Sequence, residues 1–126
     1  MDEPRRRALP AAPGQAYSGA WLAAKLGVEP RELDVRRRSG ELLGVPVGRG
    51  TEYVYPAWQF DASGRPLPAI SLVLAAAREA GLDATELSNL LERRDGMTGS
   101  TRLLDALRAG REEHVMAVIH RTGRRR

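Results

Sequence analysis

The chain has 126 residues, of which 42% are hydrophobic and 29% are charged, a composition typical of a folded globular domain. It contains no cysteine, which excludes disulfides, cysteine-ligated zinc and cysteine nucleophiles and suits a reducing cytoplasm. No apolar run approaches the roughly eighteen residues of a membrane span, so we expect a cytoplasmic protein without membrane contact. The net charge of +4 is spread evenly along the chain, and only the arrangement of the basic residues can predict nucleic-acid binding.

Two short helices are predicted after an irregular N-terminal segment. Residues 1–16 hold three prolines and no apolar period, which predicts a flexible arm. The next helix is predicted to begin at the N-cap Ser18 and to end at Gly27. A second helix is predicted from Pro30 to Gly40, with acidic groups early and three arginines late, as the helix dipole favours. The short connection between them is typical of a helix-turn-helix.

A β-hairpin is predicted next, because β-prone runs at 42–47 and 52–55 flank a glycine-containing turn. Pro46 and Pro56 predict edge-type pairing for both strands. Two helices followed by a hairpin are the arrangement of a winged helix-turn-helix, whose wing tip reaches phosphates or the minor groove. The predicted DNA contacts are Arg31, Asp34, Arg36, Arg37, Arg38 and Arg49. The alternative is that the arginines at 36–38 are only a solvated helix end.

The stretch "SGAWLAAKLGVEPRELDVRRRSGELLGVPVGRG" resembles the small winged helix-turn-helix domains of the MerR/excisionase kind. That resemblance implies DNA binding. Positions 36 and 37, which hold a ring and an aliphatic residue in that family, are both arginine here. The arginine stems can pack while the charged heads reach solvent.

Aromatic residues are concentrated at the middle of the chain, where four of the six lie within eight residues: Tyr53, Tyr55, Trp58 and Phe60. Because a few rings bury much area with few rotatable bonds, we interpret this cluster as packing between two small units. The alternatives are a partner or ligand surface and a platform that stacks single-stranded bases.

The second half is predicted to be entirely helical, with a buried central helix over about 68–80 and three further helices that end near residue 120. The predicted fold is therefore mainly α with one small β-hairpin. It comprises a flexible arm (1–16), a winged helix-turn-helix unit (17–60), a linker (61–67), a helical partner-binding unit (68–121) and a basic tail (122–126).

Two segments, "YPAWQF" at 55–60 and "LDALRAG" at 104–110, are similar to bacterial antitoxins of the Xre/MbcA/ParS type. The resemblance implies that the helical unit binds a toxin, often a RES-domain protein acting on NAD⁺, and that the complex sits on its own promoter. An anionic toxin pocket would suit arginine side chains. The predicted partner contacts are Arg102, Arg108, Arg111, His114, Arg121, Arg124, Arg125 and Arg126. The alternative for the last three arginines is a solvated, disordered tail.

No constellation for catalysis is predicted. His114 and His120 lie six residues apart and on different helix faces, and Glu112 and Glu113 are adjacent, so neither pair can act together. We therefore expect no catalytic residue, no metal and no cofactor. The leading interpretation is an antitoxin that binds a toxin and double-stranded operator DNA, as a homodimer that pairs two half-sites. The alternatives are a stand-alone regulator or excisionase-like protein, and a protein-binding adaptor that does not bind DNA.

Overall fold

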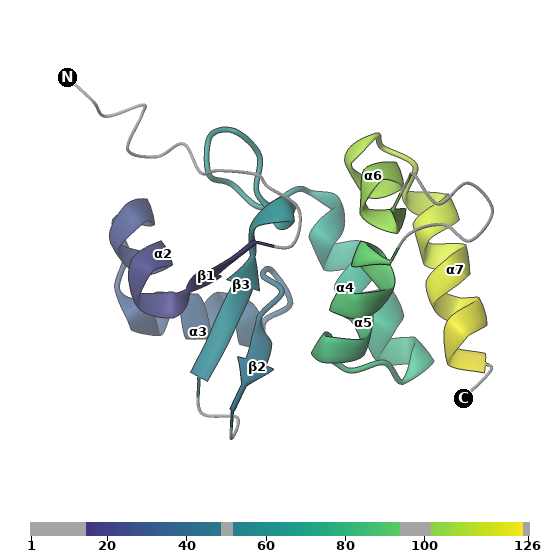
Figure 1. Cartoon of the computed structure of the whole chain (residues 1–126), viewed down its shortest axis with the longest axis horizontal. Helices are drawn as coiled ribbons and strands as arrows, with labels where there is room; N and C mark the ends of the chain where they lie inside the picture. Colours follow the sequence, from purple (N-terminus) through teal and green to yellow (C-terminus); the bar gives the residue numbers. More distant parts are fainter. Residues whose placement is uncertain (1–14, 49–51, 94–101, 125–126) are drawn as a thin grey trace.

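A computed structural model describes residues 15–48, 52–93 and 102–124 (Figure 1). The first part, which we call the head, contains β1 (Ala16–Ser18), α2 (Gly19–Leu26), α3 (Pro30–Arg38), β2 (Val45–Val47) and β3 (Glu52–Pro56). The 3₁₀ helix η1 (Ala57–Gln59) then leads into the body, which contains α4 (Ala69–Ala80), α5 (Ala84–Glu92), α6 (Leu103–Arg108) and α7 (Glu112–Arg124). The prediction of a mainly α fold with a small hairpin is confirmed.

The head is built on a three-stranded antiparallel sheet in the order β1-β3-β2. The predicted hairpin is the β2–β3 pair, but β1 was not expected: Ala16, assigned to the flexible arm, pairs with Pro56. The expectation that β3 lies at an edge is therefore wrong, since β3 is the central strand. Pro56 is tolerated because it is the last residue of β3 and lies beyond the end of β2, so no bond of the β2–β3 ladder depends on its missing N–H.

The two helices of the head begin and end close to the predicted residues. Ser18 Oγ accepts a hydrogen bond of 3.1 Å from the backbone N–H of Trp21, and Gly27 ends α2 in the left-handed conformation, with φ of 73°. Pro30 is the first residue of α3. Leu22 and Leu33 are both buried and join these helices to the core of the head. Both predicted caps of α2 are confirmed.

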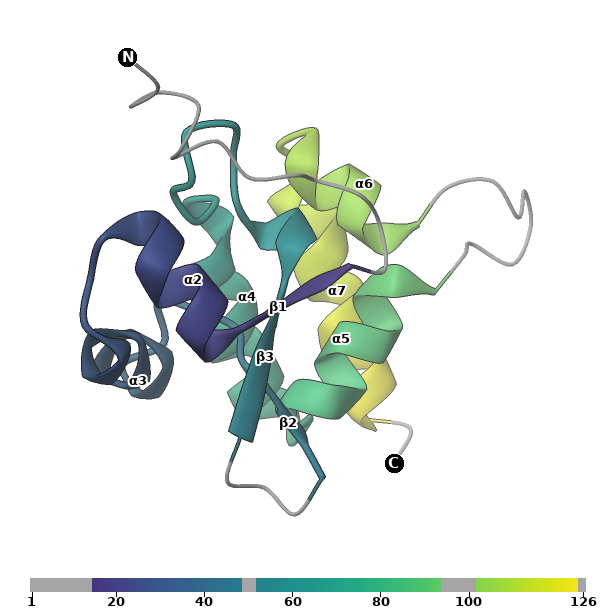
Figure 2. The same cartoon turned by 60° about the vertical axis from the view of Figure 1, so that its left-hand side comes forward.

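The body packs α4 against α7, with α5 and α6 beside them (Figures 1 and 2). α5 begins with a capping box, since Asp83 and Glu86 each accept a hydrogen bond from the other's backbone N–H. The predicted buried central helix α4 enters the core of the body on one side, where Ile70 and Val73 are buried, whereas Leu72 on its other side is 52% exposed. At the crossing of α4 and α7, a Cβ on Gly123 would lie 2.5 Å from Ala80 Cβ, so only glycine permits this close approach.

Two hydrophobic cores meet at the segment 56–60, which we call the seam. Tyr55 and Phe60 belong to the core of the head, with Tyr17 and Leu22. Trp58, between them in sequence, belongs instead to the core of the body. In both views α2 and α3 lie on the side of the sheet away from α5 and α7 (Figures 1 and 2). None of the helices in the described ranges has the length and hydropathy of a membrane span.

Asp61 organises the turn that follows the seam. Its Oδ1 accepts hydrogen bonds from the backbone N–H of Ser63 at 2.9 Å, from Ser63 Oγ at 2.7 Å and from the N–H of Arg65 at 3.0 Å. The bond from the Ser63 hydroxyl, followed by that from the Arg65 amide, lowers the pKa of Asp61 below its ordinary value of 3.8. The ionised carboxylate is therefore the form that stabilises this turn.

Stability should consequently depend on pH through Asp61. A lowered pKa in the folded state means that the contribution is present above 3.8 and is lost as the pH falls through the folded pKa. The unfolding free energy of the wild type should exceed that of Asp61→Asn at neutral pH, and the difference should shrink below pH 3.8. Urea unfolding at several pH values measures it. A difference that does not change with pH would show that the ionised carboxylate contributes nothing.

Candidate nucleic-acid interface

The outer face of α3 presents a continuous exposed stripe. Leu33 is buried in the core of the head, and this contact fixes the rotation of the helix about its axis. Arg31, Val35 and Arg38, at spacings of four and three residues, then lie together on the opposite side. All three are exposed. Val35 is 51% exposed, although exposure of an apolar side chain to water is unfavourable. The stripe therefore places an aliphatic group between two guanidinium groups.

Val35 is the residue of this stripe that the sequence analysis missed. The sequence pattern that could have identified it is its spacing from Leu33, because a residue two positions after an inward leucine lies on the far side of a helix. Arg38 is held only lightly, by a bond of 3.3 Å from its Nε to the backbone oxygen of Asp34. This bond uses a single donor of the guanidinium group.

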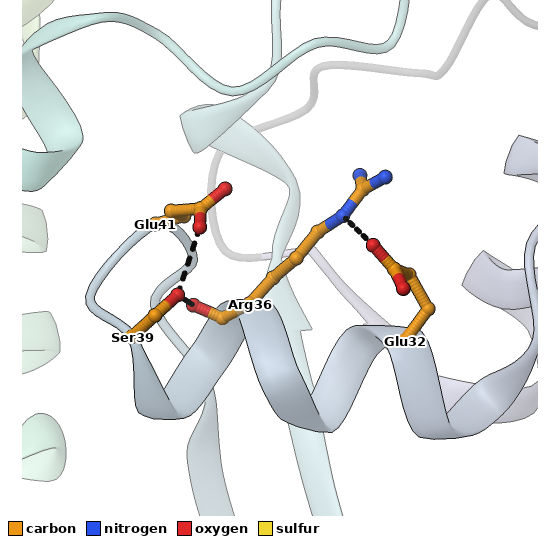
Figure 3. Close-up of polar contacts among 4 residues, drawn as sticks. All are labelled: Glu32, Arg36, Ser39 and Glu41. Atoms are coloured by element: carbon orange, nitrogen blue, oxygen red, sulfur yellow. Dashed lines mark hydrogen bonds and ion pairs between the residues drawn. The ribbon is translucent and has the colours of Figure 1, made fainter.

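Arg36 lies beside the stripe and is half-buried. Its Nε donates to Glu32 Oε2 at 3.1 Å, and in Figure 3 the two terminal nitrogens extend past that carboxylate. Helical pairs of this kind contribute only about 0.3–0.5 kcal/mol, so Arg36 can turn toward a phosphate at little cost. Ser39 Oγ lies 3.1 Å from the backbone oxygen of Arg36 and 2.8 Å from Glu41 Oε2, and these contacts close the end of α3.

Arg37 does not occupy the outward position expected of a DNA contact. Its side chain is 19% exposed and turns toward the sheet, where Nη2 donates to Asp34 Oδ1 at 3.1 Å. The guanidinium carbon lies 3.8 Å from the centre of the Tyr53 ring. Burial acts to lower the pKa of Arg37, but the bonds to Asp34 and Tyr55 outweigh it and leave the pKa above its ordinary value. The inward position arises because the aromatic face of β3 lies directly under the last turn of α3.

A groove of about 310 Å³ separates α3 from the wing formed by β2 and β3. Two carboxylates line it, those of Asp34 and Glu52, together with apolar groups such as Leu33 and Val47. Carboxylates repel phosphates but can accept hydrogen bonds from base amino groups. Arg49, predicted at the tip of the wing, lies outside the described residues.

The predicted aromatic cluster spans the end of β3 and the seam. Tyr55, Trp58 and Phe60 are buried and Tyr53 is half-buried. Trp58 Nε1 donates to Glu92 Oε2 at 3.1 Å in the body, and Arg108 Nη1 donates to the backbone oxygen of Trp58 at 3.1 Å. Arg108, a predicted partner contact, is thus bonded within its own chain through one of its nitrogens.

Gln59 holds the seam to the loop after α3, a role that the sequence analysis missed. It is fully buried, and its Oε1 accepts from the N–H of Leu43 at 2.8 Å. Its Nε2 donates to the backbone oxygens of Leu43, at 2.8 Å, and Pro56, at 3.2 Å. The register of β2 and β3 would next bring Leu43 opposite Pro56, which has no N–H to offer. The Gln59 amide replaces the missing backbone pairing.

The predicted partner contacts in the body fall into two groups. His114, Arg121 and Arg124 share the exposed face of α7, opposite the buried Val115 and Ile119. The remaining members are not on this face: Arg102 is half-buried at the start of α6, Arg108 bonds Trp58, and Arg111 is exposed just before α7. Arg125 and Arg126 lie outside the described residues. Within the described ranges, no group of three or more metal-ligating side chains comes together.

Comparison with known proteins finds a similar solved structure. No protein-family model matches the chain, and no curated protein matches it. The chain is similar in structure to Rv2175c, solved by NMR, with a TM-score of 0.71 and 24% sequence identity. The similarity covers 92% of this chain and 90% of that chain, so the shared architecture includes both head and body. At this identity the likeness shows the fold alone, and the antitoxin resemblance stays a prediction.

Proposed function

We propose that this protein binds double-stranded DNA, is not an enzyme, and places α3 in the major groove. The observation that carries the proposal is the exposed stripe of Arg31, Val35 and Arg38 on a helix whose other side is fixed in the head. Guanidinium groups recognise guanine or phosphate, and an aliphatic side chain contacts the methyl group of thymine. An exposed valine between two arginines would be buried against the groove when DNA binds, which is more favourable than its exposure to water.

The binding should depend strongly on salt and on the stripe. Removing one phosphate contact lowers the slope of log K against log [salt] by about 0.9. Arg31→Ala and Arg38→Ala should each weaken binding to the DNA upstream of the gene, and a residue that contacts phosphate should also lower this slope. The matched control is Arg78→Ala, which removes an exposed arginine from α4 and should bind as the wild type does. Stripe variants that bind as tightly as this control would show that α3 does not read DNA.

Recognition is proposed to involve a dimer, since a single small helix-turn-helix covers one half-site and gains specificity by pairing. A duplex with two half-sites about 10 base pairs apart should then bind two chains, as measured by analytical ultracentrifugation. A single half-site should bind more weakly. A complex of one chain on the full site would contradict pairing.

A finer proposal is that the protein is an antitoxin, in which the body binds a toxin and the head represses the shared promoter. The observation that favours it is the pair of exposed arginines Arg121 and Arg124 on the outer face of α7, beside His114 and Glu113, which can pair with acidic or phosphate groups of a partner. The resemblance of 55–60 and 104–110 to antitoxins agrees with this role. The alternatives are a regulator that acts without a toxin and an adaptor that does not bind DNA.

Co-expression with the product of the neighbouring gene tests the finer proposal. The tagged protein should retain that product, and Arg121→Glu together with Arg124→Glu should release it without affecting DNA binding. A stand-alone regulator would bind DNA and retain no such product. An adaptor would retain a partner and show no salt-dependent DNA binding.

A further inference from the structure

Arg37 contacts two elements of the head, α3 and β3, through different chemistry. Its guanidinium group stacks on the Tyr53 ring of β3, with 3.8 Å between the guanidinium carbon and the ring centre. The same group donates to Asp34 on α3 at 3.1 Å. Planar stacking together with directed hydrogen bonds is a combination that arginine provides and lysine does not.

The stem of Arg37 is equally confined. A Cβ on Gly44 would lie 2.6 Å from Cδ of Arg37 and 3.1 Å from Cε2 of Tyr55. The loop between α3 and β2 therefore passes directly over the arginine stem, and glycine at position 44 provides the space. Arg37 Nε is buried and has no hydrogen-bond partner among the described residues. A side chain that was free to move would turn this donor to water, so the packing of the stem holds the arginine in place.

We propose that Arg37 is a positioning residue that clamps the last turn of α3 onto the wing strand β3. This inference rests on the proposed DNA binding. Val35, two residues before Arg37, and Arg38, one residue after it, project in other directions around the helix axis. Holding Arg37 inward therefore turns both of them outward. Together with the buried Leu33, the clamp holds the outer face of α3 toward the groove, and it fixes the angle between α3 and the wing.

Salt-dependent DNA binding separates a clamp from a phosphate contact. Arg37→Met should weaken binding about tenfold, because stacking and the charged hydrogen bonds are removed, and leave the salt slope unchanged. Arg37→Lys should be weakened in the same way, because lysine can reach a phosphate but cannot replace a stacked, forked group. The matched control is Arg38→Met on the exposed face, which should lower the slope by about 0.9 if Arg38 contacts a phosphate. A lowered slope in Arg37→Met that Arg37→Lys restores would overturn the proposal.

Amide hydrogen exchange of the free protein tests the clamp without DNA. In Arg37→Met, and in Tyr53→Leu, exchange should accelerate in β2, β3 and the end of α3. Exchange in α4 and α7 should stay unchanged, which reports that the chain is still folded. Tyr53→Phe, which keeps the ring, should behave as the wild type. Unaltered exchange in the wing of Arg37→Met would refute the clamp even if the wild type fails to bind DNA, whereas that failure alone would refute only the proposed function.

Discussion

Replacing Gln59 with leucine is expected to destabilise the protein by about 2–6 kcal/mol, because two buried backbone groups lose their partner and each costs about 1–3 kcal/mol. The variant would leave both the N–H and the carbonyl oxygen of Leu43 unpaired inside the seam. Leucine has nearly the volume of glutamine, so the change tests the hydrogen bonds rather than the packing. Urea unfolding of the wild type and Gln59→Leu measures the difference.

Gln59→Glu is the control of nearly identical shape. A glutamate at this position keeps one acceptor for the N–H of Leu43 but, when ionised, sets an oxygen against two backbone oxygens, those of Leu43 and Pro56. Burial raises the pKa of such a carboxyl, so the penalty should grow as the pH rises through that value and be smallest in acid, where the protonated group can donate. A variant that is as stable as the wild type at neutral pH would show that the amide does not hold the seam.

Replacing Trp58 with alanine is expected to cost about 3–5 kcal/mol, the usual cost of deleting a large buried ring. Trp58 is the part of the seam that enters the core of the body, where it also bonds to Glu92. Trp58→Phe should cost less, because it keeps a ring in the cavity and removes mainly the indole hydrogen bond. Urea unfolding again gives these values.

The same variant shows whether the seam makes head and body unfold together. In Trp58→Ala the remaining tryptophan is Trp21, which lies in α2 of the head and stacks on Tyr17. Its fluorescence reports the head, whereas far-UV circular dichroism reports all helices. We expect the two transitions to coincide in the wild type and to separate in the variant. Coinciding transitions in Trp58→Ala would mean that the coupling of the two units does not depend on this ring.

The parts of the fold that the sequence predicted are those set by local chemistry. Ser18, Gly27 and Asp83 mark helix ends through their own hydrogen bonds or backbone angles, and the structure places the ends there. β1 was missed because three residues after a proline-rich segment carry no detectable alternation, and only pairing with β3 makes them a strand. The central place of β3 follows from the same distant contact.

The candidate site likewise has features that the local sequence predicts and features that depend on distant contacts. That α3 has an exposed basic face follows from its own sequence, since Arg31 and Arg38 are far round the helix from Leu33. The inward direction of Arg37 follows from its place four residues after the buried Leu33, but its stacking on the Tyr53 ring, sixteen positions later in the chain, depends on a distant contact. The role of Gln59 likewise depends on Leu43, whose backbone partner is replaced because Pro56 has no N–H.

An NMR titration of the ¹⁵N-labelled protein with duplex DNA from its upstream region tests the central claim most directly. Amide shift changes should be largest around Arg31, Val35 and Arg38, should continue into the wing, and should be absent from α7. They should fade as salt is added, because phosphate contacts release counterions. Shift changes centred on α7, or none in α3 at low salt, would contradict the claim that this helix reads DNA.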